Sequence, residues 1–434
     1  MKDVVLPKAT GPLIGEIEVP GDKSISHRSV ILGSLAKGKT KITHFLDGED
    51  CMRTVEAFRK MGVNIKKNDL ELEIEGKGID ALQEPLEPLN FGNSGTTTRL
   101  MLGLLAGLPF FTTIYGDASL SKRPMDRVVH PLRKMGASFT GRDDGNLLPI
   151  AIQGGNLNGI IYELPVKSAQ VKSAILLAGL VADGKTTVIE SAQTRDHTER
   201  MLQAFGADIH IQGNQISITN KNELRAVDVY VPGDISSAAF FLVAAAIVPG
   251  SELTLKNVGI NESRSGIIDV MEQMGAALQI TNERVMSGER VGDITVKYSD
   301  LKGTVIEGDI IPRLIDEIPI IALLATQAKG TTIIRDAEEL RVKETDRIAA
   351  VAEVLTTLGA DIETTEDGMT IKGKTKLTGG NTSAYHDHRM AMMNAIASLV
   401  ADREVIIDDV SSISISYPDF FQDMEKVLQA SEGN

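Results

Sequence analysis

The chain has 434 residues, of which 42% are hydrophobic and 24% are charged. This length exceeds what one hydrophobic core usually serves, so we expect two domains. Lysine and arginine number 45, while aspartate and glutamate number 59, which gives a net charge of −14. Such a surface disfavours nucleic acid and anionic membranes as partners. An anionic substrate would therefore have to be captured by a local group of cations.

The start of the chain and its cysteine content indicate a cytoplasmic protein. Residues 1–7 lack the apolar stretch of a signal peptide, and the longest apolar run, residues 238–248, is too short to span a membrane. The single cysteine, Cys51, excludes an internal disulfide and a cysteine-based zinc site.

Two interleaved patterns predict a repeated unit. In the first, an apolar helical segment ends in glycine and a short strand follows; these glycines are Gly62, Gly136, Gly206, Gly275 and Gly359, at intervals of 74, 70, 69 and 84 residues. In the second, a helix of small residues leads through a turn into a β-branched strand. Together they predict six units of strand–helix–strand–helix–strand–strand, in two halves of three. The alternative is an ordinary α/β protein in which these endings coincide by chance.

The sequence Val-Pro-Gly-Asp marks the start of each half. It occurs at residues 19–22 and again at 231–234, so we expect the halves to meet near residues 228–240. Each half then opens with the same strand-to-helix corner, and only the first copy carries lysine and arginine there. The predicted fold class is α/β (α+β), with two pseudo-symmetric domains.

The first corner, residues 20–28, is a candidate anion site. A tight Pro-Gly turn leads into a helix, whose exposed N–H groups and dipole attract anions, and Lys23, Ser24 and Arg28 add further donors. A nucleotide P-loop does not fit, because the Gly-x-x-x-x-Gly-Lys pattern is absent. A solvated basic helix start is the alternative.

Three further polar segments precede apolar helices in the first half. Residues 93–99 combine Gly95 with four hydroxyl residues and predict a second anion-ready helix start. Arg123 lies beside a proline and can fork onto a carboxylate or phosphate. Residues 167–173 place Ser168 and Gln170 at another helix start, as in a polar ligand clamp. N-caps and surface loops are the alternatives.

In the second half, Asp316 stands in an apolar context just before a hydrophobic helix. Partial burial would raise its pKa and suit it to act as a base. Lys343 and Arg347 are four residues apart and are predicted to share one helical face, with Glu344 directed into the same cleft. The alternatives are an N-capping aspartate and an exposed, salt-bridged helix.

The His-x-His sequence at residues 386–388 predicts a loop that presents Arg389 to an anion. A metal site is not expected, because no partner cluster of cysteine, histidine and glutamate is evident. Together with the segments above, this loop places six cations at starts of repeat-unit helices. They are Lys23, Arg28, Arg123, Lys343, Arg347 and Arg389. We expect the two halves to close and to bring these cations around a multiply charged anion.

Five segments, residues 20–28, 92–101, 116–125, 341–347 and 386–392, together closely resemble the 5-enolpyruvylshikimate-3-phosphate synthase family. The resemblance runs from about residue 12 to about residue 420, in the same order and spacing. It implies two domains, each of three βαβαββ units, that close on substrate, with an N-terminal strand that crosses back. The domains would be 22–239, mainly on the shikimate 3-phosphate side, and 1–21 with 240–434, which would contribute to the phosphoenolpyruvate side and carry Asp316.

The resemblance also implies a reaction. The enolpyruvyl group of phosphoenolpyruvate would pass to the 5-hydroxyl of shikimate 3-phosphate, releasing inorganic phosphate in chorismate and aromatic amino acid biosynthesis. No metal or organic cofactor is implied, the partners are small-molecule substrates, and a monomer is expected. In the family, glyphosate occupies the phosphoenolpyruvate site.

Residue roles follow from the matched motif positions, as what the resemblance implies. Residues expected at shikimate 3-phosphate are Lys23, Ser24, Arg28, Ser168, Gln170 and Lys343. Residues expected at phosphoenolpyruvate are Lys23, Gly95, Arg123, Gln170, Arg347 and Arg389. Asp316 would accept the proton of the 5-hydroxyl, and Glu344 and Lys23 are both candidates to protonate the enol carbon.

The chain departs from the best-known pattern of the family. Where the family has Asn-Ala-Gly-Thr-Ala, this chain has Ser94 and Thr97 in place of the two alanines, and Ala169 replaces a serine. Ile415 replaces a lysine, which puts one phosphoenolpyruvate contact in doubt. Arg195 resembles the second class of the family, in which an arginine lies by the shikimate ligand in place of an aromatic contact. These differences leave the sensitivity to glyphosate open.

Two rival functions remain. The related transferase that acts on UDP-N-acetylglucosamine usually has a mobile-loop cysteine and a Lys-Asn pair, whereas Lys23 here precedes Ser24 and Cys51 falls in a predicted helix. A non-catalytic repeat scaffold is the other rival, but it would not need six cations at matching helix starts.

Overall fold

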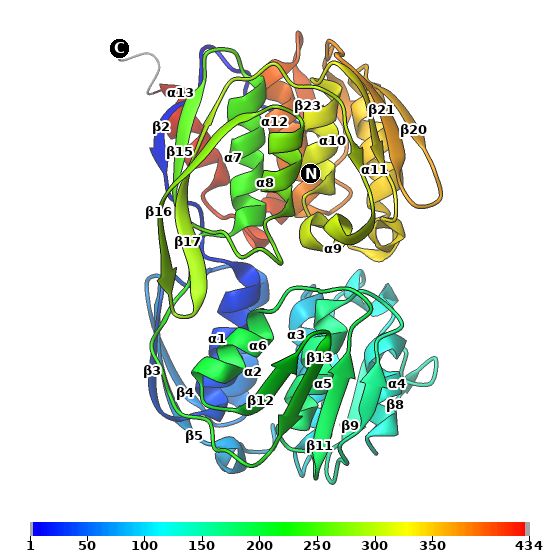
Figure 1. The fold of residues 1–434 in the computed structure, drawn as a ribbon. Helices are drawn as coiled ribbons and strands as arrows, with labels where there is room; N and C mark the ends of the chain where they lie inside the picture. Colours follow the sequence, from blue (N-terminus) through cyan, green and yellow to red (C-terminus); the bar gives the residue numbers. More distant parts are fainter. Residues whose placement is uncertain (1–2, 430–434) are drawn as a thin grey trace. The chain divides into compact units, whose positions relative to one another are not determined.

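The computed structural model describes residues 3–429 and divides into two compact units (Figure 1). Unit 1 comprises residues 1–20, 232–285 and 290–434, and unit 2 comprises residues 21–231 and 286–289. The chain therefore passes between the units at 20–21 and 231–232, and again at 285–286 and 289–290 around a short turn. The expected boundary at residue 239 is misplaced, because it falls inside helix α7 (Ile235–Ile247), which begins directly after the second Val-Pro-Gly-Asp and belongs to unit 1.

Helices occupy two kinds of position in unit 2. The inner helices are α1 (Lys23–Leu35), α3 (Gly95–Gly107) and α5 (Ala169–Gly179), and the outer ones are α2 (Glu49–Lys60), α4 (Asp126–Lys134) and α6 (His197–Ala204). The inner helices are buried along almost their whole length, because their sequences are apolar or small nearly all round. Helices α3 and α5 lie very close together, since a Cβ at Gly103 would meet the carbonyl oxygen of Ala174 at 2.1 Å.

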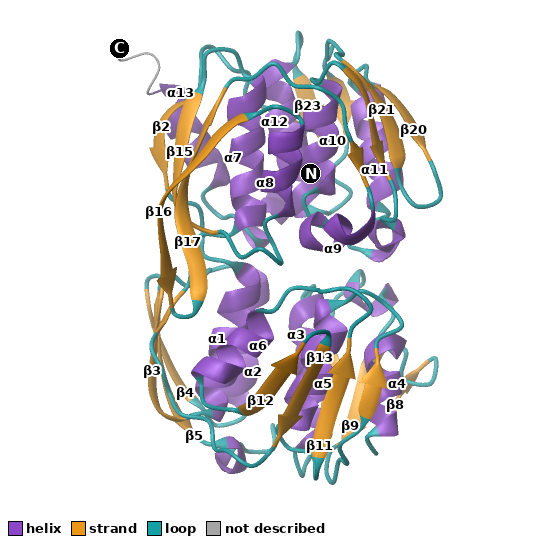
Figure 2. Ribbon diagram, in the orientation of Figure 1, coloured by secondary structure: helices purple, strands orange, loops and turns teal. Residues whose placement is uncertain are grey.

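The strands of unit 2 form three four-stranded sheets (Figure 2). The first has the order β14 (Val229–Tyr230), β3 (Lys37–Thr43), β5 (Glu71–Lys77), β4 (Asn64–Asn68). The second has the order β6 (Leu89–Asn90), β7 (Phe111–Tyr115), β9 (Leu147–Gln153), β8 (Ser138–Arg142). The third has the order β10 (Ile161–Glu163), β11 (Lys185–Ile189), β13 (Gln215–Thr219), β12 (Asp208–Gln212). In each sheet the first pair is parallel and the others are antiparallel.

Unit 1 repeats this plan. Its inner helices are α7, α10 (Ile318–Thr326) and α12 (His388–Val400), and its other α-helices are α8 (Gly266–Gln273), α9 (Ile311–Leu314), α11 (Arg347–Thr357) and α13 (Phe420–Gln429). One sheet has the order β16 (Ala277–Met286), β17 (Glu289–Lys297), β15 (Glu252–Gly259), β2 (Ile14–Ile17). Another has the order β18 (Val305–Ile306), β19 (Gly330–Ile334), β21 (Met369–Gly373), β20 (Asp361–Thr364). None of the helices within residues 3–429 is long and apolar enough to cross a membrane.

Five units have the predicted two helices and four-stranded sheet, but two of them take their first strand from a distant segment, since β14 pairs with β3 and β2 pairs with β15; the sixth unit departs further. Within the described residues, the sixth sheet has three strands, in the order β1 (Val4–Val5), β23 (Val405–Ile407), β22 (Gly380–Thr382). Strand β1 comes from the start of the chain and pairs antiparallel with β23. The expected crossing of an N-terminal strand is also present, because β2 pairs with β15. Short 3₁₀ helices cover Ile79–Ala81, Leu120–Lys122, Gly308–Ile310, Glu338–Val342 and Ser411–Ile415.

The turn between β16 and β17 belongs to unit 2, where it is held by a buried ion pair. His197 Nδ1, in the first turn of α6, lies 2.8 Å from Glu289 Oε1, and each side chain is 3% exposed. Burial alone would lower the pKa of His197, but the charge and hydrogen bond of Glu289 outweigh it and raise that pKa. The pair therefore favours the protonated imidazole in the folded protein.

Replacing His197 should remove the pH-dependent stabilisation that its ion pair with Glu289 gives the folded protein. Because the folded-state pKa of His197 is raised, the stabilisation is fully present below about pH 6.5 and is lost as pH rises through the raised pKa. We expect His197→Gln to lower the melting temperature more at about pH 6 than at about pH 9. His210→Gln is the control, since His210 is 77% exposed. An equal loss for His197→Gln at both pH values, measured by calorimetry, would contradict this.

Candidate functional site

The N-terminal ends of the three inner helices of unit 2 meet at one place. Asp22, Ser94 and Ser168 cap α1, α3 and α5 by accepting backbone hydrogen bonds. Gln170 Nε2 donates to Thr96 Oγ1 at 3.0 Å, so α5 and α3 begin side by side. Three helix starts thus direct the N–H groups of their first turns and the positive ends of their dipoles to the same region. This arrangement favours a negatively charged ligand.

Arg28 is a buried cation whose hydrogen bonds go to neutral oxygens. Its guanidinium donates to Thr198 Oγ1 at 2.6 Å, to Ser173 Oγ at 2.8 Å and to the carbonyl oxygen of Ser24 at 2.9 Å. Burial lowers the pKa of Arg28 to about 10, and the positive charge of Arg195 adds to this effect. A desolvated cation that donates only to neutral acceptors is well prepared to receive a carboxylate or phosphate.

Two guanidinium groups flank Gly95, the first residue of α3. Arg99 Nη1 donates to Gln170 Oε1 at 2.7 Å, and Arg123 Nη2 donates to Asn93 Oδ1 at 2.5 Å. A Cβ atom at residue 95 would lie 3.1 Å from Arg99 Nη1 and 3.3 Å from Arg123 Nη1. Glycine therefore keeps the space next to both cations open. Arg99 is a site residue that our sequence reasoning missed, although it lies four residues after Gly95.

Lys23 begins α1 and forms an ion pair with Asp50 of α2, at 3.2 Å, with side chains 17% and 10% exposed. Asp50 is a second neighbour that the sequence did not reveal. Cys51 follows it within α2, as expected, and is buried. Because Asp50 orients its ammonium group, Lys23 is held close to the capped N-terminus of α1.

Arg347 organises the candidate site residues of unit 1. Its Nε and Nη2 atoms donate to the two carboxylate oxygens of Asp387 at 2.8 and 3.2 Å. Nη2 also donates to Glu344 Oε2 at 2.6 Å, and Nη1 donates to Asp316 Oδ1 at 3.3 Å. Burial opposes the charge of Arg347, but Asp387, Glu344 and Asp316 together raise its pKa above the ordinary value. The guanidinium therefore fixes three carboxylates around itself.

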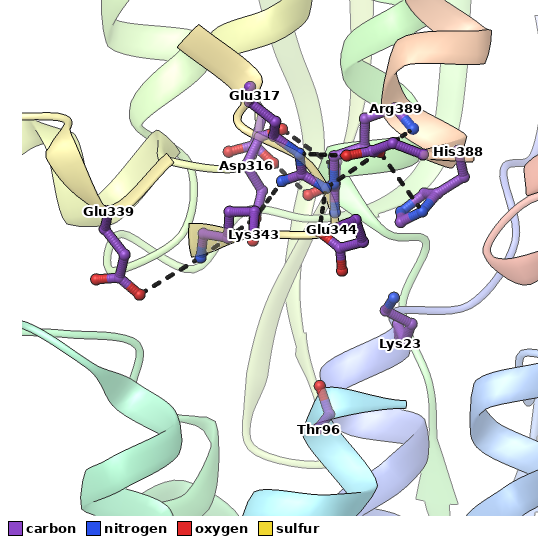
Figure 3. Close-up of polar contacts among 12 residues, drawn as sticks. Lys23, Thr96, Asp316, Glu317, Glu339, Lys343, Glu344, His388 and Arg389 are labelled. Atoms are coloured by element: carbon purple, nitrogen blue, oxygen red, sulfur yellow. Dashed lines mark hydrogen bonds and ion pairs between the residues drawn. The ribbon is translucent and has the colours of Figure 1, made fainter. Parts of the chain in front are cut away.

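Asp316 lies two residues before the start of α10 and is contacted by three cations, Arg347, Lys343 and Arg389. Lys343 Nζ is 3.9 Å from Asp316 Oδ1, and the backbone oxygen of Asp316 accepts a hydrogen bond of 3.2 Å from Arg389 Nη1 (Figure 3). The side chain of Asp316 is 15% exposed, so it is partly buried as expected, and its carboxylate contacts cations. A carboxylate in this position is a candidate to accept a proton from a substrate hydroxyl group.

Lys343 and Arg347 do not share a helical face, contrary to the prediction. Lys343 follows the 3₁₀ helix Glu338–Val342 with an extended backbone, and α11 begins only at Arg347. Asp346 caps that helix by accepting from the backbone nitrogen of Ala349, so its preference for the N-cap position moves the helix start. Both cations reach Asp316 nevertheless, one from the loop and one from the helix.

The His-x-His segment serves to position an arginine. Asp387 Oδ1 caps α12 by accepting from the backbone nitrogen of Arg389, at 2.9 Å, and both carboxylate oxygens accept from Arg347. This second role of Asp387 was not predicted. Within residues 3–429, no group of three or more histidine, cysteine, aspartate and glutamate side chains is arranged to hold a metal ion.

The predicted site residues thus form one group in each unit. Those of unit 2 are Lys23, Ser24, Arg28, Gly95, Arg123, Ser168, Gln170 and Arg195. Those of unit 1 are Asp316, Lys343, Glu344, Arg347 and Arg389. Ile415, at the position of the family lysine, ends the 3₁₀ helix Ser411–Ile415 and is half-buried, so it offers no charge to a ligand.

Comparison with known proteins gives a consistent result. The family described as EPSP synthase (3-phosphoshikimate 1-carboxyvinyltransferase) matches residues 7–424. A protein of Oceanobacillus iheyensis named 3-phosphoshikimate 1-carboxyvinyltransferase is 62% identical over 429 residues, which is 99% of this chain and 100% of that protein.

Solved structures agree with these matches. EPSP synthase from Acinetobacter baumannii is 44% identical, with a TM-score of 0.86 over 98% of this chain and 97% of that chain. The enolpyruvyl transferase NikO from Streptomyces tendae, 18% identical with a TM-score of 0.79 over 98% and 97% of the two chains, shares the fold. The family match over nearly the whole chain and the high identity to full-length relatives show that the chain belongs to the EPSP synthase family.

Proposed function

We propose that the chain transfers the enolpyruvyl group of phosphoenolpyruvate to the 5-hydroxyl of shikimate 3-phosphate and releases inorganic phosphate. The activity that names its relatives, 3-phosphoshikimate 1-carboxyvinyltransferase, supports this proposal. The structural observation that carries it is Arg28, a buried cation with neutral acceptors beside three capped helix starts. Both substrates are anions, and a protein with a net negative charge needs a local group of positive charges such as this one to bind them.

Shikimate 3-phosphate is proposed to bind the residues at the helix starts of unit 2, together with Lys343. Arg28 and Lys23 would supply charge, Ser24 and Ser168 hydroxyl groups, and Gln170 an amide. Arg195 is proposed as a further contact, because its charge already reaches Arg28. Hydrogen bonds from charged donors to carboxylate or phosphate oxygens are the strong ones in such a site.

Phosphoenolpyruvate is proposed to bind Arg123, Arg389 and the open space at Gly95, with Arg347 as a further partner. Arg347 already binds Asp387, Glu344 and Asp316, so contact with phosphoenolpyruvate would require it to exchange a carboxylate. Lys23 and Gln170 would touch this substrate as well as shikimate 3-phosphate.

The proposed chemistry needs one base, one acid and preorganised positive charge. Asp316 accepts the proton of the 5-hydroxyl while the oxygen attacks C2 of phosphoenolpyruvate and C3 gains a proton from Glu344 or Lys23. The tetrahedral intermediate then loses a proton from C3, back to the group that supplied it, and expels inorganic phosphate, which forms the enol ether of the product. Cations fixed before the reaction stabilise developing negative charge without reorganisation cost. We further propose a cytoplasmic monomer whose domains close on shikimate 3-phosphate and which requires no metal or organic cofactor.

The test is phosphate release from phosphoenolpyruvate, measured with and without shikimate 3-phosphate. Release that requires both substrates is the expected result. Release with UDP-N-acetylglucosamine instead would keep the enolpyruvyl transfer and replace the acceptor. No release with either acceptor would favour the non-catalytic scaffold.

Gly95→Ala should weaken phosphoenolpyruvate binding selectively. The added methyl group would stand 3.1 and 3.3 Å from two guanidinium nitrogens, which must shift to accommodate it. We expect KM for phosphoenolpyruvate to rise about tenfold, equivalent to about 1.4 kcal/mol, with KM for shikimate 3-phosphate within a factor of about two. Gly184→Ala is the control for adding a methyl group, since nothing lies within 4 Å of a Cβ there; its positive φ of +85° would show in stability alone. Unchanged kinetics for Gly95→Ala would contradict the placement.

A further inference from the structure

The first turn of α6 holds three consecutive buried polar residues, each bound to a different element. His197 pairs with Glu289, Thr198 accepts from Arg28 of α1, and Glu199 pairs with Lys172 of α5 at 2.6 Å. All three side chains are buried, and apolar side chains would fill such positions on a helix equally well. Of the three, only Thr198 contacts Arg28, a residue that we propose to bind shikimate 3-phosphate. The proposed mechanism gives Thr198 itself no role.

Donor and acceptor counting fixes the direction of the hydrogen bonds around Thr198. The hydroxyl of Ser173 donates to the carbonyl oxygen of Ala169 at 2.7 Å, which uses its only proton. The contact of 2.6 Å between the two hydroxyls must then be donated by Thr198 to Ser173. Thr198 Oγ1 accepts in turn from Arg28 Nε at 2.6 Å. A directed chain therefore runs from Arg28 through Thr198 and Ser173 to Ala169.

This chain ends at the segment that begins α5. Ala169 lies between Ser168 and Gln170, both of which are proposed to contact shikimate 3-phosphate. Arg28 Nη2 also donates to Ser173, so Thr198 and Ser173 together hold the guanidinium in one plane. Without the hydroxyl of Thr198, Arg28 Nε would lose its acceptor in a buried place, and the guanidinium would turn to find another.

We propose that Thr198 is a positioning residue for shikimate 3-phosphate, which orients Arg28 and ties that orientation to the first turn of α5. The inference rests on the proposed function, since it takes Arg28 as a ligand of that substrate. Thr198 acts through Arg28 and does not itself touch the substrate.

A separate contact keeps α6 in place when Thr198 is altered. Lys172 is fully buried and pairs with both Glu199 and Glu190, at 2.6 and 3.1 Å. This ion cluster joins α6 to α5 independently of the hydroxyl of Thr198. A valine, which has nearly the same shape as threonine, should therefore preserve the packing and remove only the hydrogen bonds.

The test compares Thr198→Val with Thr198→Ser in steady-state kinetics of the full chain. For the valine variant we expect KM for shikimate 3-phosphate to rise about tenfold, with kcat and KM for phosphoenolpyruvate within a factor of about two. The serine variant, which keeps the hydroxyl, should restore most of the affinity. Thr194→Val is the matched control, because Thr194 precedes the same helix but binds Glu190. It should change melting temperature without changing KM for shikimate 3-phosphate.

Arg28→Gln separates failure of this inference from failure of the proposed function. If Arg28→Gln raises KM for shikimate 3-phosphate and Thr198→Val does not, the positioning role is overturned and the proposed function stands. If neither does, the proposed role of Arg28 fails and the inference fails with it. In the double variant, Thr198→Val should add nothing to Arg28→Gln, since it acts through that side chain. Additive effects, or equal losses for both substrates, would show a merely structural threonine and overturn the proposal.

Discussion

Replacement of Asp316 by asparagine is expected to lower kcat by about 10²- to 10⁴-fold, the usual contribution of a general base. The amide has nearly the same shape as the carboxylate but cannot accept the proton of the 5-hydroxyl. Asp316 is only 15% exposed, so bulk water is a poor substitute for it. Lys343 and Arg347 keep their charges in this variant, which should preserve the affinity for anionic substrates.

Turnover and binding have to be measured separately to test this role. Phosphate release gives kcat, and titration calorimetry with shikimate 3-phosphate gives the dissociation constant. Asp300→Asn is the control, because the side chain of Asp300 is 78% exposed and its contact with Lys329 is long, at 3.7 Å. Near-normal turnover of Asp316→Asn would refute the assignment of the base. Loss of binding with unchanged kcat would instead make Asp316 a substrate ligand.

Local sequence signals predicted the helices and the antiparallel strands of the repeat well, because these parts of each unit are encoded locally. Glycines such as Gly62 and Gly136 adopt positive φ at helix ends, and the β-branched runs after the second type of turn form strands. The sixth sheet was not predicted, because its edge strand Val4–Val5 comes from the opposite end of the chain. No local pattern records such a pairing. The domain boundary was misplaced for a related reason, since α7 continues through residue 239 without a break.

The helix starts of the candidate site were predictable, and the partners that orient them were not. The structure places Lys23, Gly95 and Arg389 at or next to helix starts, where the sequence predicted them. Their tertiary neighbours, such as Asp50 and Thr198, lie far away in sequence and have no motif of their own. For Asp316, the apolar neighbours in sequence predicted partial burial, but they did not reveal the cations that contact the carboxylate from other segments.

Arg347→Met is expected to destabilise the protein by about 3–5 kcal/mol, the range found when one partner of a buried ion pair is removed. Arg347 is 1% exposed and Asp387 is fully buried, so water cannot replace the lost hydrogen bonds of Asp387. Glu344 and Asp316 would lose the cation that they share, and three carboxylates would repel one another. The loss should exceed that of truncating an apolar side chain of similar size at the surface.

Chemical unfolding followed by circular dichroism distinguishes this effect from a loss of substrate binding, because it is measured without ligand. Arg335→Met is the matched control: Arg335 also pairs with a carboxylate, that of Glu307 at 3.1 Å, but it is 55% exposed. It should change stability by less than about 1 kcal/mol. Arg347→Lys should fall between the two, since it keeps the charge but cannot bind Asp387 with two parallel hydrogen bonds. If Arg347→Met unfolds like the control, the carboxylates of unit 1 do not depend on Arg347, and its value to the protein must lie in binding phosphoenolpyruvate.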